Sequence, residues 1–382
     1  MNTLQTRFIE PLDVLILRGN KLFGDPGSYG EALIPPWPSV AAGAIRSRML
    51  ADDNIDMQAF ARGQFSHATL GTPSAPGSFA LAAFHLARRM ADGRHELLIA
   101  PPADLSIVED EHGTAIARLS RPTALASGIG SANPLPMHPV LAETTRAKPA
   151  SGYWLTQAGF EAYLNGKLPA AVHLVKSSEL WRMDERVGVG LSVEQRRADD
   201  GKLFSLQAIA FKPGMGFLAS ITGATPPASG LLRFGGDGRG AAIHAIEHRP
   251  PAPDYAAISQ ARRCRLVLTT PGLFSQGWLP NGITQTGDGY RFDLHGVRGT
   301  LVCAAVPRAE VISGWDLAAR DGRGHPKPAQ RVAPVGSVYW LDDLDATPDA
   351  LQKLSAEGLW NTPCEDASRR AEGFNRLALA SW

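Results

Sequence analysis

Residues 231–242 read LLRFGGDGRGAA, a run that sets four glycines, two arginines and one aspartate between apolar residues. Glycine adopts left-handed backbone conformations that other residues rarely enter, and it lets a second backbone approach closely. Such a loop leaves N–H groups open to an anion, and Arg233 and Arg239 stand beside it to hold a phosphate. The same residues also suit a wide hairpin turn with its arginines in solvent, so the segment alone leaves both interpretations open.

Length and charge limit the kinds of protein to which this loop can belong. A chain of 382 residues is long enough for about two domains of ordinary size. The formal net charge is only +1, which by itself does not indicate a nucleic-acid-binding protein. Lysine occupies eight positions, so 30 of the 38 basic residues are arginine, the side chain suited to bidentate phosphate contacts and to stacking on bases.

The cysteines and the hydrophobic pattern indicate the compartment. Cys264, Cys303 and Cys364 are far apart and lack C-x-x-C spacing, which argues against a disulfide framework or a zinc cluster. The first residues, MNTLQTRFIEPLD, contain no apolar core of the signal-peptide type, and no run of 18 apolar residues occurs anywhere. We therefore expect a soluble cytoplasmic protein with no membrane partner, no metal and no other cofactor.

The N-terminal segment predicts the first half of a split β-α-β unit. Residues 7–17 end in an apolar run that is typical of a buried strand. Residues 18–30 carry four glycines and no apolar period, so we expect a long loop there. The prolines at 35–38 lead into a helix that Ser39 can N-cap and that extends to about residue 50.

That helix offers two kinds of phosphate contact. Its first N–H groups and the positive end of its dipole would seat a phosphate beside Ser39. Arg46 and Arg48 lie about 200° apart around the helix axis, so at most one of them faces any one surface.

The rest of the chain predicts an α+β protein with antiparallel sheets, because alternating strands outnumber the helices. Asp199-Asp200-Gly201 supplies a hairpin turn, and residues 118–152, poor in apolar side chains, form a long insertion or linker. We expect one domain of residues 1–150 and a second of residues 151–382. The expected strands are 78–87, 96–100, 186–193, 203–211, 214–221, 242–248, 265–269, 290–294, 301–306 and 335–341, and the expected helices are 156–164, 254–262, 348–357 and 367–379.

Five sequence blocks, in order along nearly the whole chain, resemble one protein family. They are the N-terminal strand ending in Arg18, PPWPSVAAGAIRSRML (35–50), ELWRMDERVGVGL (179–191), LRFGGDGRGA (232–241) and KPAQRVAPVGSVYW (327–340). The family is the third subunit of the Cmr effector module, a RAMP protein of type III-B CRISPR systems. Five blocks in the same order are far more specific than a glycine loop alone. Leu22 departs from the pattern, in which the loop after the first strand carries proline.

The resemblance implies a fold and a role. The fold would be two ferredoxin-like (RRM-like) domains, the first carrying the insertion and the second the glycine-rich loop. The role would be a non-catalytic subunit, acting in antiviral defence, that binds the 5′ handle of the crRNA. Its protein partners would be the large palm-domain subunit and the adjacent backbone RAMP subunit.

Single-stranded RNA is held through its phosphates by Arg, Lys and backbone N–H groups. The insertion around residues 118–148 would wedge between nucleotides, as extended hairpins of RAMP proteins do. The candidate RNA-binding residues are Arg18, Lys21, Ser39, Arg46, Arg48, Arg233, Gly235, Gly236, Gly238, Arg239 and Gly240.

Two other functions stay open. A metal-independent RAMP endoribonuclease that processes crRNA precursor would use His85, His138 or His244 as general acid or base. The sequence assembles no set of catalytic residues around any of these histidines. A scaffold that contacts only protein is the other alternative.

Other enzyme motifs are incomplete. Residues 244–248, HAIEH, match the H-x-x-E-H pattern of inverted zinc proteases, which needs a helix, but Pro250 and Pro251 follow at once. The triplet Gly235-Gly236-Asp237 resembles nucleotide cyclase palms, but glycine follows Asp237 and the acidic pair is missing. No GxxxxGK[ST] or GxSxG sequence occurs, so a P-loop NTPase or a serine hydrolase has no support in the sequence.

Overall fold

The computed structural model describes residues 4–17, 19, 29–30, 32–143, 147–192, 194–195 and 197–382. The fold is α+β with mostly antiparallel sheets, as predicted. The chain divides into two compact units, each built from three segments: unit 1 is Met1–His95, Ser177–Glu247 and Val311–Ala329, and unit 2 is Glu96–Lys176, His248–Glu310 and Gln330–Trp382. The continuous domains 1–150 and 151–382 stay a prediction, because compactness is a different criterion from independent folding.

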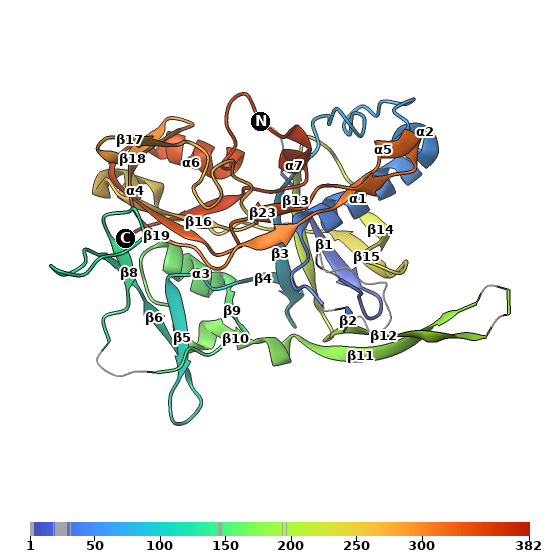
Figure 1. Ribbon diagram of the computed structural model, residues 1–382, viewed down its shortest axis with the longest axis horizontal. Coiled ribbons are helices and arrows are strands. Elements are labelled where there is room, and N and C mark those ends of the chain that lie inside the picture. The colour runs from blue at the N-terminus through green and yellow to red at the C-terminus, as the bar shows by residue number, and fades with distance from the viewer. Residues whose placement is uncertain are drawn as a thin grey trace. The chain divides into compact units, whose positions relative to one another are not determined.

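Unit 1 is organised around an antiparallel run of strands (Figure 1). Their order is β3 (Ala80–Arg89), β13 (Met215–Thr222), β1 (Gln5–Pro11), β15 (Gly240–Ala245) and β14 (Ser229–Arg233). Buried aromatic rings hold the sheet to its core, with Phe217 stacked against Phe84 and Phe234 at centroid distances of 5.3 Å. Aromatic pairs add stabilisation beyond the area they bury, so this stack fixes the first residue of the glycine-rich loop, Phe234, in place.

The first strand is shorter than the sequence predicts. β1 ends at Pro11, which has no N–H to continue the ladder, and of the residues beyond it only Leu15 forms an isolated bridge, with Ile209. Leu15, Ile16 and Leu17 are nevertheless buried. The prediction that this apolar run is buried is therefore confirmed. The prediction that residues 12–17 continue the strand is wrong.

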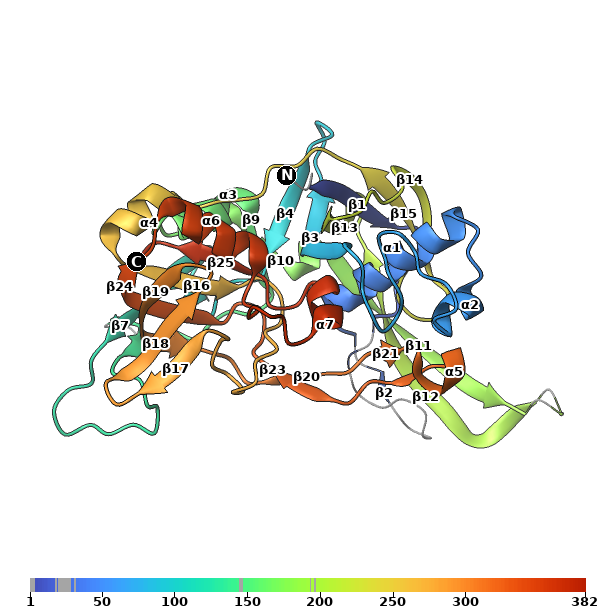
Figure 2. The same cartoon turned by 90° about the horizontal axis from the view of Figure 1, so that it is seen from above.

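Helix α1 (Pro38–Asp52) packs against β3 and β14 (Figure 2). Its N-cap is Trp37, whose side chain makes no capping hydrogen bond, so the prediction that Ser39 caps the helix is wrong. Pro38 takes the first helical position, where its missing N–H costs nothing, and this places Ser39 inside the first turn. Ala41, Ile45 and Met49 form the buried stripe of the helix, and Ala44 beside them is half-buried.

A long two-stranded ribbon, β11 (Trp181–Leu191) paired with β12 (Ala198–Phe211), extends past the sheet of its unit (Figure 1). The hairpin prediction is confirmed, but the turn predicted at residues 199–201 is wrong. The Ser192 N–H donates to the Arg197 carbonyl at 2.9 Å and closes the turn earlier, so residues 199–201 continue β12. The short β2 (Tyr29–Gly30) pairs in parallel with the middle of β12.

Unit 2 contains an antiparallel sheet flanked by helices. The strand order is β17 (Ile283–Thr286), β18 (Gly289–Leu294), β19 (Val297–Ala305), β24 (Val338–Asp345), β16 (Cys264–Leu268) and β25 (Leu377–Ala380). Helices α3 (Gln157–Leu164), α4 (Tyr255–Ala261) and α6 (Pro348–Glu357) confirm three predicted helices, and Thr156, Asp254 and Thr347 cap them through side-chain oxygens.

The helix predicted over residues 367–379 is confirmed only at its start and is wrong beyond residue 371. Helix α7 (Ala367–Ala371) is short, and the chain returns as β25 to pair with β16. Gly373 and Asn375 have φ angles of +93° and +59°, which end the helix. The Asn375 side chain is buried and bonds the backbone of Leu273 and Leu359, contacts about which local sequence carries no information.

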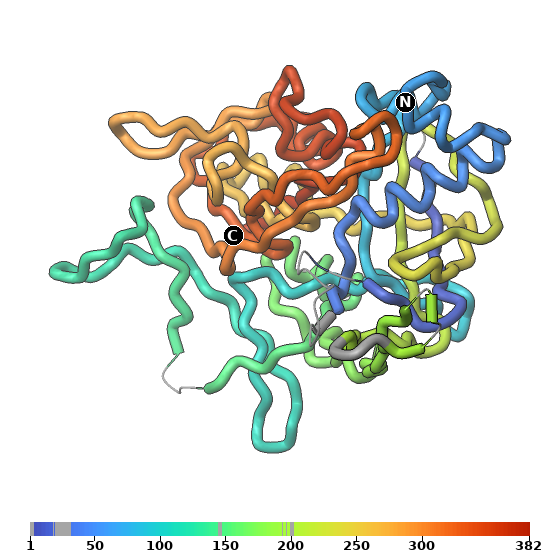
Figure 3. The backbone as a smooth tube through the Cα atoms, turned by 45° about the vertical axis from the view of Figure 1, so that its right-hand side comes forward, coloured from blue at the N-terminus to red at the C-terminus, as the bar shows by residue number. Residues whose placement is uncertain are grey.

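The predicted insertion is partly ordered. β7 (Arg121–Thr123) and β8 (His138–Val140) pair across it, and β5 (Leu105–Glu109) and β6 (Ala115–Leu119) form a hairpin just before it. In Figure 3 the β5–β6 hairpin and the loop that joins β7 to β8 extend outward as teal tubes. The remaining elements are α2 (Met57–Ala61), β4 (His95–Ile99), β9 (Tyr153–Thr156), η1 (Ala171–His173), β10 (Leu174–Lys176), η2 (Ser177–Glu179), β20 (Glu310–Ile312), β21 (Trp315–Asp316), α5 (Ala319–Gly322), β22 (His325–Pro326) and β23 (Gln330–Val332).

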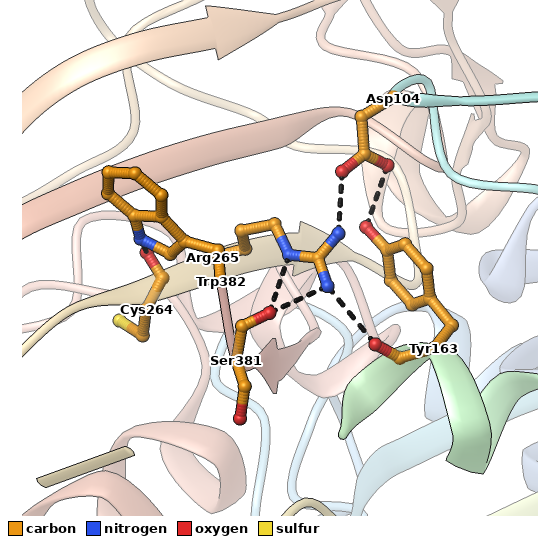
Figure 4. A network of polar contacts seen from close by, with 6 residues as sticks. All are labelled: Asp104, Tyr163, Cys264, Arg265, Ser381 and Trp382. Atoms are coloured by element: carbon orange, nitrogen blue, oxygen red, sulfur yellow. Dashed lines mark hydrogen bonds and ion pairs between the residues drawn. The ribbon is translucent and has the colours of Figure 1, made fainter. Parts of the chain in front are cut away.

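A buried polar network closes unit 2 (Figure 4). The Arg265 guanidinium donates to Asp104, to the carbonyl of Tyr163 in α3 and to the carbonyl of Ser381, while the Tyr163 hydroxyl donates to the other Asp104 oxygen. The Trp382 indole N–H donates to the Cys264 carbonyl. Every element of this network belongs to unit 2, so the C-terminus is held to β16 and α3 from within the unit.

Candidate nucleic-acid interface

The glycine-rich loop is the turn of the β14–β15 hairpin. Arg233 pairs with Gly240 at the end of the ladder, and the Phe234 N–H donates to the Arg239 carbonyl at 2.8 Å. Phe234 is fully buried and anchors the loop to the core. The hairpin interpretation therefore describes the backbone, and the remaining question is which loop groups stay available to a ligand.

The loop packs closely on the segment that follows β1. The Gly236 N–H donates to the Ile16 carbonyl at 2.8 Å. Gly235 has a φ of +82°, and a Cβ there would lie 2.8 Å from the same carbonyl oxygen. Asp237 and Gly238 also have positive φ, at 58° and 64°. Glycine at 235 is thus required both by backbone conformation and by close approach.

The loop retains donors for an anion. Within the described part of the chain, the N–H groups of Gly235, Asp237 and Gly238 meet no hydrogen-bond acceptor. Successive N–H groups around left-handed residues form a concave anion-binding surface. The Gly236 N–H differs from these three, because Ile16 already occupies it.

The two arginines of the loop differ in their partners. Arg239 Nη1 lies 2.9 Å from Asp13 Oδ2 and Nη2 lies 3.8 Å from Asp237 Oδ2, so two carboxylates offset its charge. Arg233 is exposed and forms no ion pair with any residue that the structure describes. Arg233 is therefore the more available cation for a phosphate.

The arginines of α1 diverge, as their predicted angular separation requires. Arg48 Nη1 donates to the Leu231 carbonyl of β14 at 3.3 Å and Nη2 pairs with Asp52 at 2.6 Å. The Arg46 guanidinium lies 4.9 Å from the ring centre of Phe79. The structure thus brings Arg48 to the strand that leads into the glycine-rich loop and directs Arg46 to another neighbour.

The other candidate residues lie elsewhere. Ser39 is in the first turn of α1, about 14 Å along the helix axis from Arg48. Gly240 is the first residue of β15, and a Cβ there would lie 3.3 Å from Leu12 Cδ1. Arg18 and Lys21, together with the departure from the family pattern at Leu22, are outside the described residues.

Two of the three candidate histidines lie in one row across the sheet of unit 1. His85 pairs with Leu218, Leu218 with Phe8 and Phe8 with His244, so their side chains share one face. His95 adds a third imidazole, with its ring centre 4.5 Å from that of Phe8. Burial, and then the charge of Arg89, lowers the pKa of His95.

The remaining histidine motifs have a different context. His138 lies in β8 of unit 2, apart in the chain from the row just described. His244 is in a strand and residues 246–250 are not helical, so the H-x-x-E-H sequence lacks the helix that a zinc site of that type needs. Among the described residues, no three His, Cys, Asp or Glu side chains gather in a way that could hold a metal ion.

The family model described as CRISPR-associated protein (Cas_Cmr3) matches residues 7–382, nearly the whole chain. The chain belongs to the Cas_Cmr3 family. The resemblance to the third Cmr subunit, inferred from the five sequence blocks, is therefore confirmed. No curated protein matches the sequence.

Three solved structures similar to this Cas_Cmr3 protein are chains of type III-B Cmr-beta complexes. A chain of the type III-B Cmr-beta complex bound to cognate target RNA is 14% identical, with a TM-score of 0.47 over 98% of this chain and 99% of that chain. The complex with target RNA and AMPPnP gives 13% identity, a TM-score of 0.46 and the same coverage. A chain of the apo Cmr-beta complex is 12% identical, with a TM-score of 0.27 over 64% of this chain and 97% of that chain.

Sequence reasoning missed two features of this Cas_Cmr3 protein. The first is the third imidazole, His95, which carries no motif and is recognised only through its ring contact with Phe8. The second is the pairing of Arg239 with Asp13, two residues separated by 226 positions. No helix of the described chain is long and apolar enough to cross a membrane.

Proposed function

We propose that this Cas_Cmr3 protein is a non-catalytic subunit of a type III-B CRISPR effector complex and that it binds the 5′ handle of the crRNA. Membership of the family supports the assignment to the complex. The observation that carries the RNA-binding part is the glycine-rich loop, where three N–H groups without acceptors lie next to Arg233 in the described chain. Backbone N–H groups and arginine together bind phosphates of single-stranded RNA.

The proposal also covers the protein partners, the compartment and the biological role of the chain. Its partners are the large palm-domain subunit and the adjacent backbone RAMP subunit, in the cytoplasm, and the complex serves antiviral defence. Each half of the chain is a variant of the ferredoxin-like fold of RAMP proteins. A net charge of +1 supports a role inside an assembly, since a nearly neutral chain alone gains little from release of counterions.

Retention of handle-bearing crRNA by the reconstituted complex tests the proposal. Arg233→Glu places a carboxylate beside the loop and is expected to weaken crRNA binding about tenfold, since a hydrogen bond to a charged group contributes about 1.5–3 kcal/mol. Arg94→Glu is the matched control, because Arg94 is an exposed arginine of the same unit on a different turn. Equal crRNA retention by both variants and the native chain would favour a scaffold that contacts only protein.

A second experiment locates the RNA directly. Photocrosslinking of handle RNA to the complex should yield linked peptides that contain Arg233–Arg239, and the Arg233→Glu change should reduce that yield. Gly236→Asp is a poorer probe, since a Cβ at Gly236 would lie 3.3 Å from the Ile16 carbonyl oxygen and disturb the loop.

The second candidate function is the metal-independent endoribonuclease. Its supporting observation is that His85 and His244 share one face of the sheet with His95 beside them. General acid–base cleavage needs imidazoles within reach of a ribose 2′-OH and its phosphate. Incubation of repeat RNA with the full chain in EDTA separates the functions: intact RNA supports the binding subunit, whereas cleavage that His244→Ala abolishes identifies the enzyme.

A further inference from the structure

Unit 2 contains an open groove that the proposed function does not use. Its volume is about 530 Å³, which lies within the range of small-ligand sites. The residues that line it come from four separated segments of the unit. They are Ala132, Asn133, Pro134, Gly277, Trp278, Ala304, Val306, Pro307, Ala309, Arg331, Val332 and Ala333.

The fold holds the aromatic side of the groove in place. The backbone carbonyl of Trp278 accepts the Tyr339 hydroxyl at 2.7 Å, and Tyr339 itself is fully buried in the core. Trp278 packs against that core while it remains half-buried, so part of the indole faces the groove. An aromatic ring anchored in this way can accept a planar group without first being ordered.

Another part of the lining is a fixed backbone segment. Ala333 and Gly272 exchange two hydrogen bonds of 2.8 and 2.9 Å, and Val332 and Ala333 are buried. Because side chains alternate along β23, the buried Val332 directs its neighbour Arg331 outward. The guanidinium is exposed and makes no ion pair with any described residue.

The charges of the groove favour an anion. No Asp or Glu is among the lining residues, so Arg331 is not neutralised there. Asn133 contributes a directional group: its carboxamide oxygen accepts the Leu135 N–H at 3.1 Å, which leaves the NH₂ group to donate.

We propose that this groove binds one nucleotide, with the base stacked on Trp278 and the phosphate held by Arg331. Aromatic side chains stack on the bases of single strands, and guanidinium groups bind their phosphates. The Asn133 amide would donate to an acceptor on the base edge. The nucleotide comes either from an RNA strand or from the free pool, and its chemistry is the same in both cases. This inference does not depend on the proposed function of the glycine-rich loop.

Equilibrium dialysis of the full chain with labelled 5′-UMP and 5′-AMP tests the groove for a free nucleotide. Trp278→Ala and Arg331→Gln are each expected to weaken binding about tenfold, because stacking of a base on an aromatic side chain or a charged hydrogen bond supplies that factor. Trp278→Phe keeps an aromatic face and should stay within about threefold of the native affinity. Arg298→Gln, at an exposed arginine of the same unit, is the control and should bind like the native chain.

Photocrosslinking with a 5-iodouridine RNA tests the groove for a nucleotide of a strand. The Arg233→Glu chain is used as background, so that any RNA held at the glycine-rich loop is reduced. Linkage to the peptide containing Trp278, lowered about tenfold by Arg331→Gln, supports a strand nucleotide. Binding of free nucleotide with no such linkage supports the free pool.

The inference is overturned if Arg331→Gln changes neither dialysis nor crosslinking while its melting temperature equals that of the native chain. Arg331 is exposed, so this variant keeps the test valid even if Trp278→Ala fails to fold. An apolar peptide that binds the groove with nucleotides excluded would also overturn it. If crRNA binding depends on Arg233 while both groove variants have no effect, the groove inference fails and the proposed function stands.

Discussion

Arg265 and Asp104 form an ion pair that is almost completely removed from solvent. Arg265 Nη1 lies 2.8 Å from Asp104 Oδ2, and the two side chains are 1% and 0% exposed. Burial raises the pKa of Asp104, and the adjacent guanidinium opposes that rise. The remaining donors and acceptors are also satisfied, by the hydroxyl and carbonyl of Tyr163 and the carbonyl of Ser381. A buried pair with complete hydrogen bonding tolerates replacement of both partners better than removal of one.

Asp104→Asn is therefore expected to destabilise the chain by about 3–5 kcal/mol, because it leaves the Arg265 guanidinium buried without a counter-charge. Urea unfolding at neutral pH measures the loss. The double change Asp104→Leu with Arg265→Met should cost less than the single change, since no uncompensated charge remains. Asp92→Asn removes the acid of an exposed ion pair with Arg94 and serves as control, with stability close to native. A native-like Asp104→Asn protein would show that the pair does not hold unit 2 together.

Gly235→Ala is expected to destabilise the glycine-rich loop by about 1–3 kcal/mol, because the left-handed backbone and the 2.8 Å approach to the Ile16 carbonyl both exclude a methyl group. Gly43→Ala is the matched control. Gly43 is exposed in α1 with no atom within 4 Å of an added Cβ, so alanine should stabilise by roughly 0.5–1 kcal/mol there. Thermal unfolding of the two variants should shift in opposite directions, and a shift in the same direction would contradict the loop geometry.

Local chemistry explains which elements the sequence predicts well. Helix α6 begins and ends at the predicted residues, because Thr347 caps it, Pro348 occupies its first position and Gly358 follows its end. The region predicted as a helix up to residue 379 fails for a different reason: strand β25 exists only because β16 offers a ladder more than one hundred residues away in the chain. The secondary-structure propensities of residues 367–379 contain no information on a partner strand so far away in the chain.

The candidate site also combines a feature that local sequence predicts with features that depend on long-range contacts. The glycine-rich loop is predictable, since four glycines between apolar residues allow little else. The availability of its cations is not, because Arg239 is paired with Asp13 and Arg48 with the carbonyl of Leu231, both of them long-range contacts. Among the candidate residues that the structure describes, Arg233 stands out as the available cation only when these partners are known.

Stability should fall as the pH falls below neutrality, and His95 should contribute. Burial lowers the pKa of His95 below its ordinary value of 6.5, so the folded chain binds its proton less readily than the unfolded chain. The contribution of neutral His95 to the free energy of unfolding is fully present above pH 6.5. It is lost as the pH falls toward the lower pKa that His95 has in the folded chain. The melting temperature at pH 5.5 should lie below that at pH 7.5, and His95→Gln should narrow the difference.

His295 provides the comparison for this effect. Burial is also the main cause that lowers the pKa of His295. His295→Gln should therefore narrow the difference between the melting temperatures at pH 5.5 and pH 7.5. The double variant with His95→Gln and His295→Gln should narrow this difference further. An unchanged pH dependence in the double variant would show that other groups account for acid destabilisation.

The ribbon of β11 and β12 exposes an apolar face: Val187 is 69% exposed, Leu191 63% and Leu203 58%. The double change Val187→Thr with Leu191→Thr should leave the melting temperature unchanged, since neither side chain is buried, and should reduce self-association of the isolated chain. Light scattering over a concentration series measures the second effect. Ile209→Thr, at a fully buried position of the same ribbon, should lower the melting temperature clearly. If the double variant loses as much stability as Ile209→Thr, Val187 and Leu191 are buried in the folded chain. That result would contradict the exposed apolar face of the ribbon.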